Sequence, residues 1–127
     1  MPAPAPGLTN LTSLIATMRP TLSPTTYLFA TISMEDSSTL FETLNPHPFE
    51  MLYREREGWT LIASRTTIEA LEPDIVKETA FPCKKITLDV HSSLEAVGFM
   101  AAVATRLAQV GTGMGVNPVS GFYHDHL

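Results

Sequence analysis

The stretch KKITLDVHSSLEAVGFMAAVATRLAQVG, residues 84–111, decides the fold class. In its first part Ile86, Leu88 and Val90 alternate with polar residues, which is the period of a strand with one buried face. An alanine-rich segment follows, and its small side chains allow a helix to lie close to a sheet. This strand and helix, with further strands after them and an earlier strand and hairpin before them, predict an α+β domain with helices on one face of an antiparallel sheet.

The helix is expected to begin at about Ser93 and to end at Gly111. Ser92 and Glu95 have the spacing of a capping box, and glycine is typical just beyond a helix end. In a continuous helix Phe99 falls one turn from Glu95, on the polar outer face. This position has two equally supported interpretations, a surface for a partner or an isolated exposed apolar side chain.

The other elements follow from spacing and turn residues. A short amphipathic helix is expected after the proline-rich start, and a β-branched and aromatic run predicts the first long strand. Pro118 removes a hydrogen-bond donor, so its strand is expected at a sheet edge or at a bulge. The remaining expectations are a hairpin over 49–64 that turns at Glu57-Gly58, one or two helical turns over 66–74, and loops over 35–48 and around Phe81-Pro82.

Composition limits the class of protein. The 127 residues carry a formal net charge of −5 and only 8 lysines and arginines, so neither nucleic acid nor an anionic membrane is an expected partner. The start lacks the basic and apolar segments of a signal peptide, and no apolar run is long enough to span a membrane. The single cysteine, Cys83, fits a reducing compartment, so a cytoplasmic protein is expected.

Three segments resemble the small bacterial and fungal ACT-domain proteins: LYREREGWTLI at 52–62, ITLDVHSSLEAVGFMAAVATRLA at 86–108, and GFYHDHL at 121–127. The resemblance implies a ferredoxin-like sandwich in two halves, at 8–82 and 83–127 after a flexible tail at 1–7. The second ACT unit is expected to be truncated at Leu127, before its second helix and last strand. Three explanations stay open: a truncated chain, or a missing layer supplied by the N-terminal half or by another copy.

The resemblance also implies an amino-acid site at the strand-to-helix turn. Helix-terminal amides and serine hydroxyls suit a carboxylate, and Asp89 or Glu95 suits an ammonium group. A closed capping box is the alternative. The expected ligand-binding residues are His91, Ser92, Ser93, Leu94, Glu95 and Gly98.

The expected function is a non-catalytic regulatory module that binds a small amino acid or a related metabolite. The ligand would favour one packing between domains or subunits of a homo-oligomer. The alternative is a structural or protein-interaction domain that oligomerises without a ligand.

Metal and catalytic interpretations are weaker. His124 and His126 point to one face of a strand, but two histidines are too few for a closed zinc site. Cys83 has no catalytic motif around it, and the glycines at 111, 113 and 115 form no phosphate loop. We therefore expect no metal, no cofactor and no enzymatic activity. A third hypothesis is an enzyme that uses His124 or His126 as general acid or base.

Overall fold

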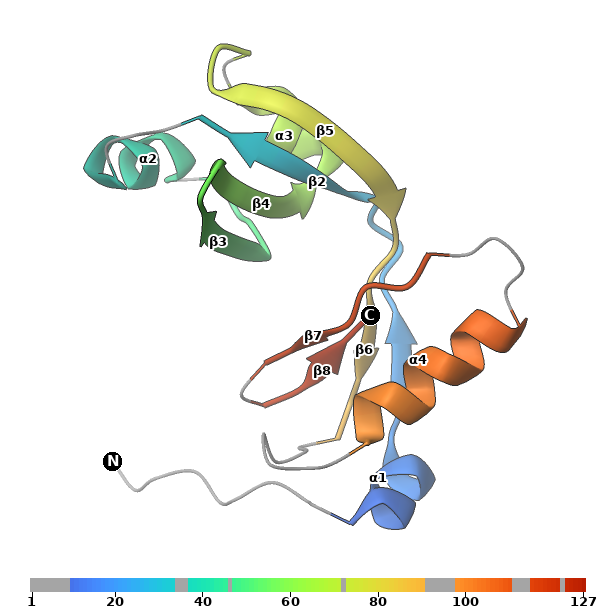
Figure 1. Cartoon of the computed structure of the whole chain (residues 1–127). Coiled ribbons are helices and arrows are strands. Elements are labelled where there is room, and N and C mark those ends of the chain that lie inside the picture. The colour runs from blue at the N-terminus through green and yellow to red at the C-terminus, as the bar shows by residue number, and fades with distance from the viewer. Residues whose placement is uncertain are drawn as a thin grey trace. The chain divides into compact units, whose positions relative to one another are not determined.

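The computed structural model of the chain describes residues 10–33, 37–45, 47–71, 73–90, 98–110, 115–121 and 123–127. The chain forms two compact units (Figure 1). The inserted unit is Pro24–Lys84, and the split unit combines Met1–Ser23 with Lys85–Leu127. Each unit has its own cluster of buried apolar residues.

The inserted unit has the element order βαββαβ of a ferredoxin-like fold. Its sheet has the strand order β3-β4-β2-β5, and all neighbouring strands are antiparallel. Its elements are β2 (Tyr27–Ile32), α2 (Ser37–Leu44), β3 (Met51–Glu55), β4 (Gly58–Ser64), α3 (Arg65–Ala70) and β5 (Val76–Cys83).

One face of this sheet carries the core. Side chains alternate along a strand, so Ala30 and Ile32 of β2 point to the face opposite that of Phe29 and Thr31. Both helices contribute to the same buried cluster, which places them together on one face. The buried members of this cluster are Ala30, Ile32, Leu40, Leu44, Leu61, Ala63, Ile68 and Leu71.

Two predicted loops of the inserted unit are regular structure. Residues 37–44 form helix α2, because Leu40 and Leu44 lie one turn apart and both are buried. The segment around Phe81-Pro82 belongs to strand β5. β5 lies at the sheet edge and pairs with β2 through register shifts, which is where a strand tolerates proline. The predicted first long strand is confirmed as β2, at Tyr27–Ile32, and the hairpin predicted within 49–64 is confirmed as β3 and β4.

The split unit repeats this topology with a different chain order. Its sheet has the strand order β1-β6-β8-β7. Each of these strands corresponds in turn to a strand of the inserted unit in the order β5-β2-β4-β3. Again all neighbouring strands are antiparallel. Its elements are α1 (Leu11–Thr17), β1 (Pro20–Leu22), β6 (Ile86–Leu88), α4 (Phe99–Val110), β7 (Val119–Ser120) and β8 (Asp125–His126).

The α+β, ferredoxin-like class is therefore correct, but the truncated second unit is not confirmed. β1 pairs with β6, with Pro20 opposite Leu88 and Leu22 opposite Ile86. β1 therefore holds the position of the last strand, which was expected after Leu127. Helix α1 holds the position of the second helix. Of the three explanations, the structure shows the layer supplied by the N-terminal part of the same chain. Sheet pairing does not require the strands to be consecutive in the chain.

The core of the split unit determines this grouping. Leu14 of α1, Leu88 of β6 and Phe99 of α4 form one buried cluster, with exposed fractions of 0, 1 and 2%. Residues 8–23 were predicted to belong to the N-terminal half at 8–82, whereas the structure groups them with Lys85–Leu127. The structure divides the chain after Ser23 and after Lys84.

Phe99 is a core residue, so its predicted place on the outer face is wrong. The prediction assumed one continuous helix from about Ser93. Gly98 has φ +83°, outside the helical range, and α4 begins after it at Phe99. Residues four apart share a face only within one continuous helix, and Phe99 is the first residue of α4, so its spacing from Glu95 does not set its face.

Candidate functional site

The predicted ligand site is only partly within the described residues. His91, Ser92, Ser93, Leu94 and Glu95 lie outside them. Gly98 is described, and it occupies the N-cap position of α4, where its carbonyl accepts a hydrogen bond of 2.9 Å from the Ala102 amide.

The backbone at Gly98 is open on its side-chain face. A Cβ atom added there would meet a single described neighbour, Leu11 Cδ2 at 4.0 Å, and the residue is exposed. The first amides of a helix have no partner within the helix, and the helix dipole favours an anion beside them. The mouth of α4 therefore offers backbone donors to a carboxylate at Gly98, because α4 begins at Phe99 and not at the predicted start near Ser93.

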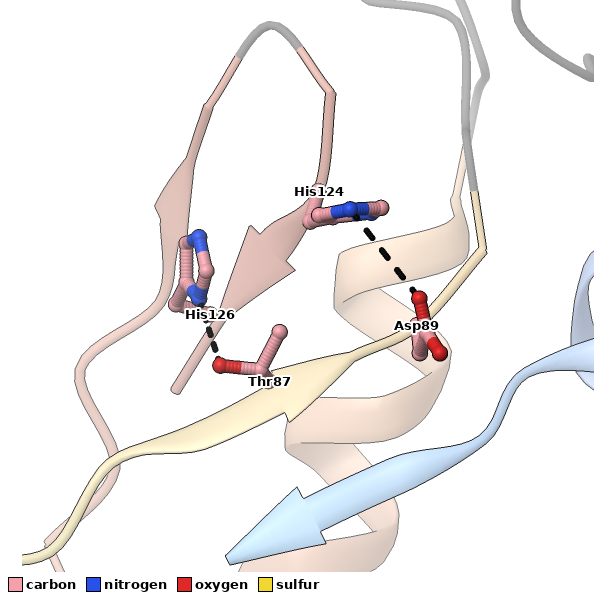
Figure 2. Close-up of polar contacts among 4 residues, drawn as sticks. All are labelled: Thr87, Asp89, His124 and His126. Atoms are coloured by element: carbon pink, nitrogen blue, oxygen red, sulfur yellow. Dashed lines mark hydrogen bonds and ion pairs between the residues drawn. The ribbon is translucent and has the colours of Figure 1, made fainter. Parts of the chain in front are cut away.

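Asp89, the nearest described acidic residue before this mouth in the sequence, is directed elsewhere. Figure 2 shows it facing His124, with 4.0 Å between Asp89 Oδ1 and His124 Nε2. Asp89 shares its side of β6 with Thr87, whereas Leu88 points to the helix-covered core. Of the two acidic residues considered for an ammonium group, Asp89 is thus placed on the face away from α4.

The tail histidines lie in the same row as Asp89. Thr87 is opposite His126 in the pairing of β6 with β8, and Thr87 Oγ1 lies 3.0 Å from His126 Nδ1 (Figure 2). Asp125 lies between the two histidines, so its side chain points to the opposite face, toward the core, and it is 5% exposed. His124 Nδ1 is buried and has no hydrogen-bond partner among the described residues.

In the described part of the chain this row consists of two separate histidine contacts. Within the described ranges, no three His, Cys, Asp or Glu side chains are grouped so as to hold an ion. His126 faces Thr87 of β6, and His124 faces Asp89, the residue that follows β6. The arrangement supports two local polar contacts between neighbouring strands.

Cys83 is the free thiol of the chain. Its Sγ lies 3.6 Å from the Tyr27 carbonyl oxygen, across the pairing of β5 with β2. Partial burial raises the pKa of the Cys83 thiol above its usual value, because burial disfavours the thiolate. A raised pKa is the reverse of what a catalytic nucleophile needs.

Sequence reasoning missed a hollow on the helix-free face of the inserted unit. Tyr53 and Glu55 line this hollow, of about 610 Å³, with Thr31, Thr60 and Glu78. The alternation of Met51, Tyr53 and Glu55 along one strand was the available signal. Strand β5 contributes the opposite side of the hollow, and this strand was not predicted from the sequence.

The comparisons with known proteins agree with the fold. The ACT domain family matches residues 6–84. The chain belongs to the ACT domain family. The match covers the inserted unit together with α1 and β1.

One solved structure is also similar to this ACT-domain chain. It is a crystal structure of a Vibrio cholerae protein of unknown function, described as a possible transport protein. The two chains are 36% identical with a TM-score of 0.64, and the similarity covers 84% of this chain and 73% of the other. No curated protein matches significantly.

Membership of the ACT family supports a regulatory domain that binds small molecules, since ACT domains are generally non-catalytic regulatory modules. Among the residues described, none of the helices is both long and apolar enough to cross a membrane.

Proposed function

We propose that this protein is a non-catalytic regulatory ACT module that binds a small amino acid, or a related metabolite, beside the mouth of α4. The observation that carries the proposal is the ACT family match, together with two ferredoxin-like units in one chain. The proposed ligand-binding residues are the backbone at Gly98 with His91, Ser92, Ser93, Leu94 and Glu95.

The chemistry of this site divides between backbone and side chains. The amides of the first turn of α4 would hold the ligand carboxylate, and the missing Cβ of Gly98 leaves room for it. Because Asp89 faces His124, we assign the ammonium contact to Glu95. Ligand binding would then favour one packing between domains or subunits, which is the usual route from binding to regulation. Its place of action in this proposal is the cytoplasm.

The test is a thermal-shift screen of the whole chain against the twenty amino acids. A ligand that binds only the folded state raises the melting temperature in a concentration-dependent way. We expect one amino acid, or a small group of similar ones, to do so. Glu95→Gln and Ser93→Ala should reduce the shift, whereas Glu69→Gln, on the exposed side of α3, should leave it unchanged.

A chain that melts cooperatively and responds to none of the twenty would overturn amino-acid binding. So would a shift that survives both Glu95→Gln and Ser93→Ala.

An oligomeric interaction domain is the second candidate, and exposed apolar residues of the split unit favour it. Leu22 is 63% exposed on β1, which is an edge strand, and an unpaired edge is open to pairing with another chain. Light scattering coupled to size exclusion would measure the mass. A dimer that dissociates in Leu22→Lys, without any amino-acid response in the wild type, would favour this candidate.

A further inference from the structure

The hollow of the inserted unit lies on the sheet face that carries neither α2 nor α3. Its volume of about 610 Å³ is within the usual range for small-molecule sites. All of its residues come from the strands β2, β3, β4 and β5. They are Phe29, Ala30, Thr31, Met51, Tyr53, Glu55, Thr60, Glu78, Thr79 and Ala80.

Strand register explains the hollow. Residues directly opposite one another in antiparallel strands share a face. Tyr53 is opposite Thr60, Thr60 is opposite Thr31, and Thr31 is opposite Glu78, so these four form one row across all four strands. The two threonines in the middle are small and the two side chains at the ends are long. The row is therefore low at its centre and raised at both edges.

A second row beside it is apolar. Met51 is opposite Ile62, Ile62 is opposite Phe29, and Phe29 is opposite Ala80. The ring of Phe29 is held by an edge-to-face contact with Phe81, with 5.5 Å between ring centroids and 87° between planes. Phe29 is therefore held in place before any ligand arrives, which lowers the entropy lost on binding.

The charge of the hollow is negative at both ends. Glu78 stands at the β5 end of the polar row, and Glu55 lies two residues beyond Tyr53 on the same face of β3. The Thr60 hydroxyl donates a hydrogen bond to Glu55 Oε1, which orients that carboxylate. Among the described residues, no lysine, arginine or histidine lines the hollow. A guest with positive charge at both ends and an apolar middle complements this surface.

We propose that this hollow binds a linear polyamine. The rows cross three strand spacings, roughly 14 Å from β3 to β5, which suits a polyamine with ammonium groups near each end. Its methylene chain would lie along Phe29 and Met51, and the Tyr53 ring could face an ammonium group. A second copy of the chain, with the same net charge of −5, is a poorer match for two carboxylates. The proposal does not depend on the amino-acid site near Gly98.

The experiment is isothermal titration of the whole chain with spermine at low ionic strength. We expect one spermine per chain. Glu55 and Glu78 are exposed, so Glu55→Gln and Glu78→Gln should each weaken binding by about threefold, and the double variant by about tenfold. Thr31→Leu fills the low centre of the row without changing charge and should weaken binding further. Glu69→Gln removes the same charge on α3 and should bind as the wild type does.

Three results would overturn the proposal. One is that Mg²⁺ or butylamine gives the same heat of binding as spermine and competes with spermine equally well. That result would mean that cations are attracted to the acidic protein in general. Another is wild-type affinity in the folded double variant, with folding checked by circular dichroism. The third is a dimer that buries the hollow and is not displaced by spermine. The Glu95→Gln variant should keep its spermine affinity. Failure of the amino-acid proposal can therefore be distinguished from failure of the polyamine proposal.

Discussion

Two of the described glycines have positive φ, but for different structural reasons. Gly58 closes the β3–β4 hairpin with φ +145°, and a Cβ there would come within 2.8 Å of the Ile32 carbonyl oxygen. Gly98 has φ +83° with open space beside it. A side chain at Gly58 thus meets both backbone strain and a clash, whereas at Gly98 it meets strain alone.

We expect Gly58→Ala to destabilise the protein by about 2 kcal/mol or more, and Gly98→Ala to cost about 1 kcal/mol. The measurement is the denaturant midpoint of each variant, with Ala101→Gly in α4 as a control for general helix effects. Equal losses at the two glycines would show that the contact with Ile32 relaxes at little cost.

Cys83 should react slowly in the folded protein. Its pKa is raised by burial, so less thiolate is present at a given pH than in the unfolded chain. Alkylation by iodoacetamide at pH 8 should be slower in buffer than in urea. Equal rates, after correction for the effect of urea on a small thiol, would contradict the burial effect.

The same shift has a consequence for stability. Because the folded pKa lies above the unfolded one, the unfolded thiol ionises first as the pH rises past about 8.5, its ordinary value. The contribution of the Cys83 thiol to the free energy of unfolding is therefore complete below that pH and is lost progressively above it. The denaturant midpoint should decline less between pH 8 and 10 in Cys83→Ala than in the wild type.

At the scale of elements, α4 contributes a large buried side chain at its first residue. Phe99 is 2% exposed and packs with Leu14 and Leu88. We expect Phe99→Ala to cost about 4 kcal/mol through lost burial and a cavity. Val110, at the other end of α4, is 59% exposed, so Val110→Ala should cost about 0.5 kcal/mol or less. Urea unfolding of both variants is the measurement, and similar small losses would place Phe99 on the surface.

At the scale of the whole molecule, the two units differ in how the chain builds them. The inserted unit is continuous from Pro24 to Lys84 and contains its own core cluster. The split unit takes Leu14 and the edge strand β1 from before the insertion. Residues 85–127 alone therefore lack part of their core and one strand of their sheet.

We expect a fragment of residues 24–84 to fold and a fragment of residues 85–127 to remain unfolded. Circular dichroism should show a cooperative melt for the first and none for the second. A peptide of residues 8–23 added to the second fragment should increase its ordered structure, while the same peptide with Leu14→Asp should not. Cooperative folding of residues 85–127 alone would contradict the assignment of α1 and β1 to that unit.

The sequence by itself determined the α+β class, the first long strand, the hairpin around Gly58 and the ACT resemblance, because alternation and turn residues act over a few neighbours. Only the tertiary structure decided that α2 is a helix, that Phe99 is buried, and that β1 lies beside β6 although the inserted unit, Pro24–Lys84, separates them in the chain. These features depend on long-range packing, which local spacing does not encode. The hollow is of the same kind, since Tyr53, Thr60, Thr31 and Glu78 meet only through the register of four strands.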